Sequence, residues 1–330
     1  MNGNLSRALT ACALVLTQLV TASCDRASAV SIGRSARARL YAGTDSMGVA
    51  AEQLSAVPIR SPDLPENSAA AMSRTQAGGL FTINDSGNDP VLFALDTTGA
   101  LRGEWRIRGA RNVDWESAAV GPCAPDARPS CVYIGDTGDN EATHSTRTIY
   151  RVEEPVAANA RLIGSLSGAR LDYAYPDGPR DVEAMYVAPN GDVFLISKRA
   201  STDAAGHLRN GLVYRLAAEA WSERGRVTAE RVDSLDIVPG SAPFRTITDA
   251  ALSPDGRHLA VRTYMQLYVF ATDSATGRVN HATAPSVCNL VSVGEAQGEG
   301  VTWADNSGRF VLTSEGRDSP LDLVTCPLPH

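Results

Sequence analysis

Four copies of one short strand pattern constrain the fold of this chain more than any other feature of the sequence. Each copy is largely apolar and carries a carboxylate, or a Thr-Asp pair, near its start; the copies span residues 112–120, 180–187, 247–252 and 297–303. The acids at matching places are Glu116, Glu183, Asp249 and Glu299, which lie 67, 66 and 50 residues apart. Repeats of this length that open on an acid are typical of a β-propeller, in which each blade's innermost strand starts at a central channel.

The strand pattern along the rest of the chain predicts a single all-β domain over residues 50–330. Strand-like segments come in five groups of about four, separated by Gly, Pro, Asn and Asp turns. We therefore expect a β-propeller of five four-stranded blades, or six if the long segment 139–179 holds a further blade. The last group has only three strands, so we expect an N-terminal strand around 51–59 to complete it and close the ring. The one short helical candidate is 216–221.

The first 23 residues have the pattern of a secretory signal peptide. Arg7 precedes an apolar run over residues 8–20, which is too short to span a membrane. Thr21-Ala-Ser-Cys24 resembles the lipobox of bacterial lipoproteins, so we expect lipidation of Cys24 and a flexible tether over residues 24–49. Ordinary secretion, with cleavage at Ala27-Ser-Ala29, and an uncleaved anchor are the alternatives. Each of them places the folded part on the periplasmic or cell-surface side of a bacterial membrane.

The remaining cysteines fit an exported protein. Cys123, Cys131, Cys288 and Cys326 form an even set, which indicates two disulfides with three pairings open. Cys123 and Cys131 flank a short loop and look like a stapled hairpin, in which case Cys288 and Cys326 tie the last two repeats together. A zinc site is the alternative, but the chain has no Cys-x-x-Cys motif to support it.

Acidic residues are expected to gather at one end of the ring. In an antiparallel blade, the start of the first strand and the end of the second lie at the same end. The four repeat acids named above are thereby predicted as metal ligands, and we expect further carboxylates around them: Asp85, Asp114, Asp136, Asp139, Asp181 and Glu315. Oxygen-only ligands favour Ca²⁺. Neutralisation by Lys198 and Arg262, or protonation of some carboxyl groups, are alternatives to a metal. The opposite end carries only unremarkable turns.

Other signals are weaker. Trp115 and Trp303 lie inside the repeated strands and are expected to pack between blades, and Tyr264 could line a pocket at the acidic end. The chain has no Gly-x-Ser-x-Gly elbow, which argues against an α/β-hydrolase mechanism. Glu183, Lys198 and Arg262 are the only catalytic candidates, and no nucleophile stands out beside them.

Several motifs together resemble a group of exported bacterial β-propeller proteins. The motifs are Asn84-Asp-Ser-Gly, Asp114-Trp-Glu, Gly135-Asp-Thr-Gly-Asp-Asn, Tyr175-Pro-Asp-Gly-Pro-Arg-Asp-Val-Glu-Ala184, Ser253-Pro-Asp-Gly-Arg and Gln297-Gly-Glu-Gly. More distantly, the first-strand acids are similar to those of calcium-binding propellers of the phytase-like and SdiA-regulated type. The resemblance implies a propeller with a metal facing its centre, but it does not supply a reaction. Thr248-Asp249 departs from the Glu expected there, which leaves the ligand role of Asp249 open.

Two functions are compatible with these observations. The first is a lipid-tethered binding or scaffold protein of the cell envelope, acting as an extrinsic subunit or interaction platform. The second is a Ca²⁺-dependent hydrolase of a phosphoester, lactone or ester. The sequence leaves open whether the protein is an enzyme, and a small-molecule ligand fits either function. A nucleic-acid partner is not expected, because the formal net charge is −7 and phosphate binding needs clustered Lys and Arg.

Overall fold

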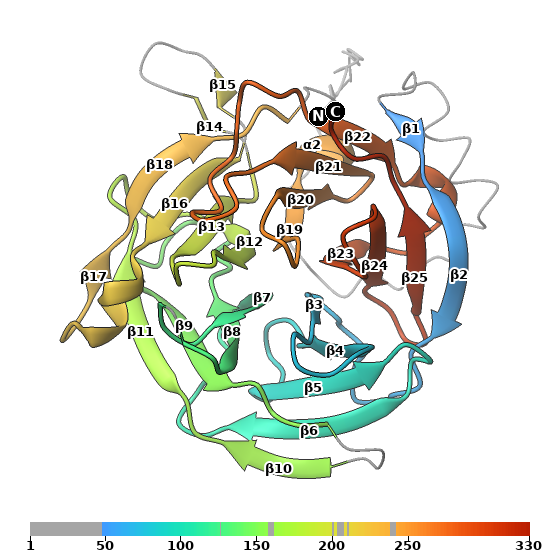
Figure 1. Ribbon diagram of the computed structural model, residues 1–330. Coiled ribbons are helices and arrows are strands. Elements are labelled where there is room, and N and C mark those ends of the chain that lie inside the picture. The colour runs from blue at the N-terminus through green and yellow to red at the C-terminus, as the bar shows by residue number, and fades with distance from the viewer. Residues whose placement is uncertain are drawn as a thin grey trace, which may run out of the picture. The chain divides into compact units, whose positions relative to one another are not determined.

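The computed structural model describes residues 48–125, 127–157, 162–199, 201–202, 208–209, 211–237 and 242–330. Five β-sheets within these residues surround a central axis, with the first strand of each sheet innermost (Figure 1). The predicted five-bladed, all-β propeller is thereby confirmed. The predicted signal peptide, Cys24 and all but the last two residues of the predicted tether lie outside the described residues.

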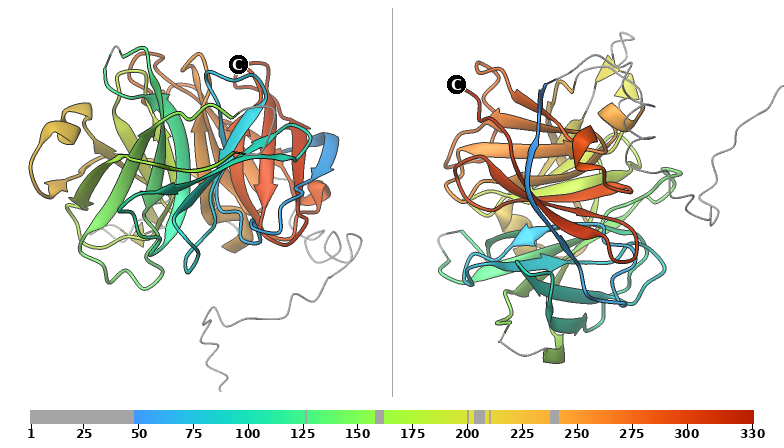
Figure 2. Two further views of the ribbon diagram at one scale, coloured as in Figure 1. Left: turned by 90° about the horizontal axis from the view of Figure 1, so that it is seen from below. Right: turned by 90° about the vertical axis from the view of Figure 1, so that its right-hand side faces the viewer.

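Each blade is an antiparallel sheet whose first four strands follow one another outward from the axis. Side-on, the strands run between the two ends of the ring (Figure 2). Their bounds are as follows: blade 1, β3 (Ala71–Met72), β4 (Gly79–Thr82), β5 (Val91–Asp96) and β6 (Leu101–Ile107); blade 2, β7 (Trp115–Pro122), β8 (Ser130–Asp136), β9 (Arg147–Glu153) and β11 (Ala169–Ala174); blade 3, β12 (Val182–Val187), β13 (Val193–Ser197), β16 (Leu212–Leu216) and β18 (Glu230–Ser234); blade 4, β19 (Ile247–Leu252), β20 (His258–Thr263), β21 (Gln266–Ala271) and β22 (Ser286–Asn289); blade 5, β23 (Gly298–Trp303), β24 (Arg309–Ser314), β25 (Pro320–Thr325) and β2 (Glu52–Pro58).

The segment 139–179 does not hold a sixth blade. It supplies β9 and β11 to blade 2, and β10 (Leu162–Leu166) returns to pair in parallel with β6 of blade 1. Two other short strands extend blade edges in the same parallel manner, β17 (Val227–Thr228) on β11 and β1 (Val49–Ala50) on β22. The remaining short elements lie in connections: the hairpin β14 (Ser201–Thr202) and β15 (Leu208–Arg209), the 3₁₀ turns η1 (Ala218–Ser222) and η2 (Val291–Val293), and the single helical turn α2 (Ala242–Arg245). The short helical candidate at 216–221 corresponds to η1.

The core consists of apolar layers between neighbouring blades. Trp115 is fully buried among side chains of blades 1 and 2, and Trp303 packs against Phe310 of its own blade and apolar residues of blade 4. Both tryptophans therefore pack between blades, as expected. Innermost strands such as β12 are buried along their whole length, because neighbouring blades cover both of their faces.

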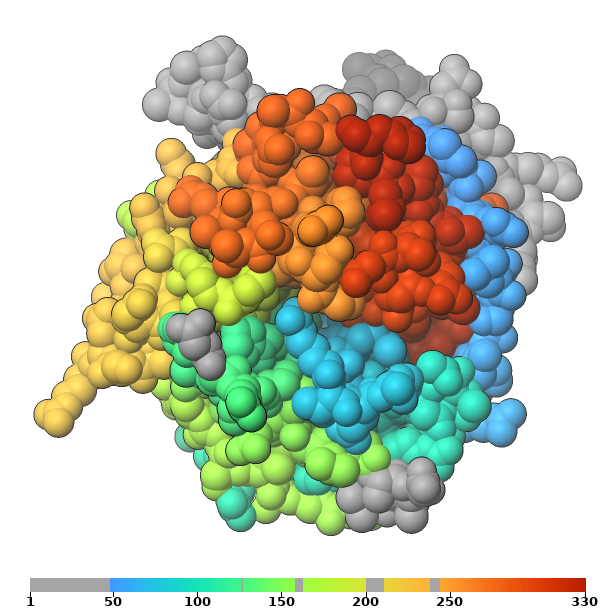
Figure 3. Space-filling view, viewed as in Figure 1, coloured from blue at the N-terminus to red at the C-terminus, as the bar shows by residue number. Residues whose placement is uncertain are grey.

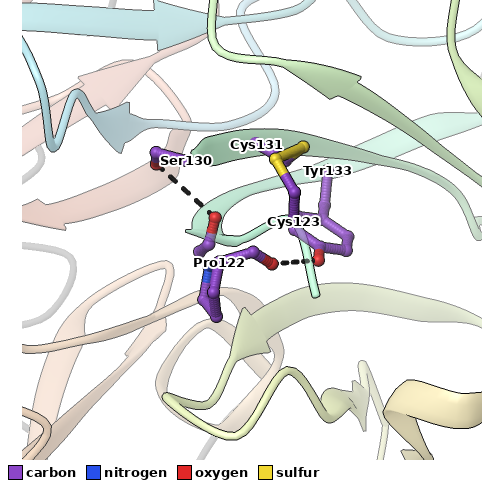
Figure 4. The surroundings of a disulfide bond; sticks show 6 residues. Pro122, Cys123, Ser130, Cys131 and Tyr133 are labelled. Atoms are coloured by element: carbon purple, nitrogen blue, oxygen red, sulfur yellow. Dashed lines mark hydrogen bonds between the residues drawn. A yellow bond between two sulfur atoms is a disulfide. The ribbon is translucent and has the colours of Figure 1, made fainter. Parts of the chain in front are cut away.

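The ring is closed by the N-terminal strand, as predicted. β2 pairs antiparallel with β25, so blade 5 combines residues from both ends of the described chain. The disulfide between Cys288 and Cys326 joins blade 4 to blade 5 near this closure. A second disulfide, Cys123–Cys131, staples the β7–β8 hairpin, where the Tyr133 hydroxyl also donates to the Pro122 carbonyl (Figure 4). Among the described residues, no helix is long and apolar enough to cross a membrane.

Candidate functional site

A β-bulge near the start of four of the five innermost strands sets the geometry of the site. In β7, β12 and β19 the strand pairing skips one residue, at Glu116, Glu183 and Thr248. In β23 it skips Glu299 and Gly300 against the single residue Thr313 of β24, which again leaves one extra residue on the innermost strand. A bulge leaves a residue out of the pairing and redirects its side chain. Three glutamates and one threonine thus occupy equivalent places around the axis. We call this end of the ring the acidic end: Asp85, Asp114, Glu116, Glu183, Lys198, Glu299 and Glu315.

Asp249 does not occupy the place that the repeat alignment gave it. The bulge in β19 falls one residue earlier, so Thr248 is the counterpart of the glutamates. Asp249 is fully buried, and its carboxylate accepts hydrogen bonds from the backbone N–H groups of Val301 at 2.8 Å, Ala250 at 2.8 Å and Ala70 at 3.4 Å. Burial raises the pKa of Asp249 well above its ordinary value, although these hydrogen bonds oppose the effect. Its carboxylate therefore links blade 4 to blades 5 and 1.

Glu116 lies in the closest group of carboxylates at the acidic end. Its ligand oxygen and those of Asp85 and Asp114 all lie within 4.8 Å of one another. Asp85 follows the second strand of blade 1, and the other two come from the start of β7, so neighbouring blades build the group. The Ser68 hydroxyl donates to Glu116 at 2.7 Å and fixes one of its oxygens. Of the four predicted metal ligands, only Glu116 belongs to this group.

Crowding of negative charge changes the protonation of these groups. Burial, together with the charges of Asp85, Asp181 and Asp136, raises the pKa of Asp114 to about 6, and Arg147 offsets part of this. Burial raises the pKa of Glu116 well above its ordinary value, and Glu183 and Asp85 add to the effect. Carboxylates that resist ionisation in this way become good cation ligands, since a bound cation supplies the missing countercharge.

Two further observations show that the group fits a cation. Gly138 packs so closely that a Cβ atom there would lie 2.6 Å from the Asp114 carboxylate oxygen and 2.6 Å from Cγ of Glu116. The backbone therefore holds the two carboxylates in place and needs glycine to do so. One carboxylate oxygen each of Asp181 and Glu183 is buried nearby without a hydrogen-bond partner among the described residues. Such orphaned oxygens are typical of sites that bind an ion or ordered water.

Lys198 is the cation that the protein itself provides at the acidic end. Its ammonium forms a buried ion pair with Glu183. Burial alone would lower the pKa of Lys198, but Glu183, Tyr264 and the surrounding carboxylates outweigh it and raise this pKa. Burial raises the pKa of Glu183 even so. One of the predicted ligands is therefore already neutralised by a lysine, as the salt-bridge alternative anticipated.

Glu299 and Glu315 form the other side of the acidic end. The Gln297 side-chain amide donates to Glu299 at 2.7 Å and to Glu315 at 2.9 Å, and so holds the two carboxylates together. Burial and the charges of Asp85 and Glu66 raise the pKa of Glu315 to about 7. Burial, Glu299 and Glu183 raise the pKa of Tyr264, which places this tyrosine among the acids, as the sequence suggested.

The remaining predicted residues support the structure around the site. Arg262 is fully buried, pairs with Glu295, and donates to the carbonyls of Gly300 at 2.6 Å and Thr313 at 3.1 Å. It therefore joins blade 4 to blade 5, and its charge is paired with Glu295. Asp136 accepts the Asp114 backbone N–H at 2.8 Å.

Asp139 and Asp181 support the loop that follows β8. Asp181 accepts the Asp139 backbone N–H at 2.9 Å. Although burial alone would raise it, hydrogen bonds from Thr143 and His144 lower the pKa of Asp139, whose carboxylate folds this loop. The sequence analysis missed Ser68, and it gave no role at the site to Gln297 or Gly138, although both lie inside motifs quoted above.

Comparison with solved structures gives similarities at low sequence identity. The chain is similar to the PQQ-bound aldose sugar dehydrogenase of Streptomyces coelicolor (12% identity, TM-score 0.45, 83% of this chain and 97% of that one). It is also similar to the β-propeller domain of Cps50 (Swd1) from Myceliophteria thermophila (11% identity, TM-score 0.40, 84% and 100%). A glucose dehydrogenase-type oxidoreductase from Thermus thermophilus gives 15% identity and a TM-score of 0.44 over 84% and 100%. No protein-family model and no curated protein matches the chain.

The fold and the site together define a five-bladed β-propeller with an acidic end. Chemically, this end offers three clustered carboxylates for a cation, one carboxyl group that titrates near neutral pH, and a lysine paired with a glutamate. It can bind a divalent cation and can exchange protons at neutral pH.

Proposed function

We propose that the protein is an exported, lipid-anchored β-propeller that binds Ca²⁺ at its acidic end and serves as a binding or scaffold protein of the cell envelope. The observation that carries the proposal is the group of Asp85, Asp114 and Glu116, whose ligand oxygens lie within 4.8 Å of one another. Oxygen ligands from two blades suit the irregular coordination of Ca²⁺ better than the strict octahedron of Mg²⁺. Glu183 and Glu299 are proposed as neighbouring charges that strengthen cation binding from outside the ligand group.

Export and lipidation rest on separate support. The two disulfides favour an oxidising compartment. The proposed lipid on Cys24 predicts that the full-length protein sediments with membranes, whereas Cys24→Ser is recovered in the soluble fraction. A Cys24→Ser protein that stays with the membranes would contradict lipidation and favour an uncleaved anchor.

Calcium titration calorimetry of the chelator-treated protein tests the cation site. We expect Asp114→Asn to weaken Ca²⁺ binding at least about tenfold, since it removes one of three charged ligands. Asp89→Asn is the matched control: it removes the same charge from the same stretch of chain as Asp85, but its side chain is exposed and pairs with Arg106. Binding of equal strength in wild type and Asp114→Asn, or no Ca²⁺ binding at all, would overturn the proposed site.

A hydrolase is the second candidate, favoured by one observation. Glu315 has a pKa of about 7 at the acidic end, where a carboxyl group that titrates at the working pH can act as general acid or base. This function predicts turnover of a phosphoester, lactone or ester by Ca²⁺-loaded protein, with loss of turnover in Glu315→Gln but not in Asp89→Asn. Absence of turnover across such a substrate panel would leave the binding function alone.

A further inference from the structure

The end of the ring opposite the acidic end contains a cavity of about 490 Å³. Its walls are residues from the middle or second half of the five innermost strands and from the segments next to them. We call it the apolar end, defined by these lining residues: Ala70, Ala71, Met72, Ser73, Arg74, Ala77, Gly78, Ala118, Ala119, Val120, Tyr186, Val187, Ala250, Ala251, Leu252, Pro254, Thr302, Trp303 and Ala304. Figure 3 shows the five blades meeting around the axis as a space-filling surface. The volume lies within the range of small-molecule sites, about 300–1,000 Å³.

Small side chains create this space. The strands β3, β7 and β19 and the turn after β23 all contribute alanine to the lining. Alanine leaves room where a leucine would fill it, and Tyr186 and Trp303 supply flat apolar walls. Pockets of this composition bind apolar bodies, and the few polar groups in them decide which molecules enter.

Nearly every polar group in the lining already has a partner within the protein. The Trp303 indole N–H donates to the Ala251 carbonyl at 2.8 Å, and the Tyr186 hydroxyl donates to the Gly277 carbonyl at 3.1 Å. The Thr302 hydroxyl accepts the Met72 backbone N–H at 3.0 Å. These side-chain groups are already hydrogen-bonded within the protein, and most of the lining side chains are aliphatic or aromatic.

Arg74 is the exception. It lies at the rim, on the turn after β3, and its side chain is exposed. Among the described residues it has no hydrogen-bond or ion-pair partner. Although the residue as a whole is exposed, the protein around its guanidinium lowers the pKa of Arg74 by burial, and the charge of Glu154 opposes this. The Glu154 carboxylate accepts from the Thr75 hydroxyl at 2.7 Å and does not line the cavity. The guanidinium therefore remains available to an anion at the mouth of an apolar chamber.

We propose that the apolar end binds a small organic monocarboxylate, with an aromatic or branched apolar body in the cavity and its carboxylate on Arg74. A guanidinium can hold a carboxylate through two parallel hydrogen bonds, which gives both affinity and orientation. The apolar body gains by leaving water for a chamber whose polar wall groups are already hydrogen-bonded. This site is separate from the proposed cation site and does not depend on it.

Calorimetric titration with 4-phenylbutyrate and its uncharged analogue 4-phenylbutanol tests the proposal. We expect the acid to bind at least about tenfold more tightly than the alcohol, in the presence or absence of a chelator. Arg74→Gln should remove this preference and leave the alcohol's affinity unchanged. Arg111→Gln, an exposed arginine just before β7 at the other end of the ring, is the matched control and should keep the preference.

A second pair of variants tests the cavity itself. Ala251→Leu places three additional carbons in the chamber and should abolish binding of both probes. Ala304→Leu, on the turn after β23, serves the same purpose if Ala251→Leu does not fold. Failure of 4-phenylbutyrate to bind at about 10 mM would overturn the proposal. So would a preference for the acid that persists in Arg74→Gln, or binding that survives both leucine variants.

Discussion

The two ends of the ring are built from the same innermost strands but carry opposite chemistry. Where the strands begin, β-bulges present Glu116, Glu183 and Glu299, and one lysine stands among the carboxylates. Where they finish, alanines line a cavity, and the guanidinium at its rim has no hydrogen-bond or ion-pair partner among the described residues. Side chains interact across blades at both ends, but at the acidic end many of them are charged, whereas the lining of the apolar end consists mostly of small or apolar residues. One short strand can therefore serve two sites, because its ends lie on opposite faces of the ring.

The buried charges at and beside the acidic end fall into two sets with different roles. Arg262 and Asp249, which lie beside that end, bond to the backbone of neighbouring blades and hold the ring together. Asp85 and Asp114 are half-buried and contribute their carboxylates to the proposed cation site. If the two sets are distinct, substitutions in the first set should lower stability and substitutions in the second should weaken Ca²⁺ binding.

The largest change in the free energy of unfolding is expected from Arg262→Gln. This change removes a buried guanidinium from Glu295 and from two carbonyls of blade 5. Breaking a buried pair in this way costs about 3–5 kcal/mol of the free energy of unfolding. Arg309→Gln is the matched control, because Arg309 pairs with Asp305 on the surface and should cost less than about 1 kcal/mol. Urea unfolding measures both.

If Arg262→Gln lowers the free energy of unfolding by less than about 1 kcal/mol, the bonds from Arg262 to blade 5 do not stabilise the ring. A second readout separates structure from binding: the folded fraction of Arg262→Gln should keep the Ca²⁺ affinity of the wild type. If Ca²⁺ affinity falls with stability, the division of the acidic end into two sets is wrong.

Gly138→Ala should have the next largest effect. The added methyl would lie 2.6 Å from the Asp114 carboxylate oxygen and must displace it or Glu116. We expect Ca²⁺ affinity to fall about tenfold, about 1.4 kcal/mol, in calorimetry. Gly164→Ala is the control, since its methyl would approach no atom closer than 3.2 Å and lies on β10 at the edge of blade 1. Unchanged Ca²⁺ affinity in Gly138→Ala would show that the two carboxylates do not bind the ion.

The sequence predicted the blades better than the site, for a physical reason. The five groups of strands were predictable because buried apolar runs between turns, such as those of β13 and β16, are a local signal. The bulges shift pairing by one residue, which no periodicity reveals, and so Asp249 was aligned where Thr248 stands. The β10 strand pairs with a strand about sixty residues earlier, so the segment containing it could be read as a further blade.

The apolar end escaped sequence analysis altogether. Its alanines come from three innermost strands and adjoining turns, and none of them is unusual in its own segment. Arg74 becomes informative only once the partners of the surrounding polar groups are known. A cavity arises from what neighbouring elements leave empty, and this property exists only in three dimensions.

The free energy of unfolding of the metal-free protein should fall as pH rises, because carboxyl groups at the acidic end have raised pKa values. The pKa of Asp114 is raised from 3.8 to about 6 and that of Glu315 from 4.5 to about 7. Because the folded protein binds these protons more tightly than the unfolded chain, their stabilising contribution is complete below about pH 4. It is lost as pH rises through 6 to 7.

Urea unfolding in chelator between pH 4 and 8 measures this effect. The double variant Asp114→Asn/Glu315→Gln should show a smaller decrease in stability over the same range than the wild type. Saturating Ca²⁺ should also reduce the decrease in the wild type, because the ion binds the ionised carboxylates. A wild type whose stability rises from pH 4 to 7 in chelator, as for a protein dominated by well-paired carboxylates, would contradict the crowding of charge at the acidic end.

The smallest effect is expected for a ligand bound at the apolar end on Ca²⁺ binding at the acidic end. Coupling between two sites requires an element with two arrangements that both ligands bias. The innermost strands are buried and hydrogen-bonded along their length, so a ligand at their end has little means of moving their start. We expect saturating 4-phenylbutyrate to change the Ca²⁺ dissociation constant less than about twofold, or 0.4 kcal/mol. Ala251→Leu should likewise leave Ca²⁺ binding unchanged. A larger shift in either titration would mean that the strands slide or twist as units, and the two ends would then have to be treated as one site.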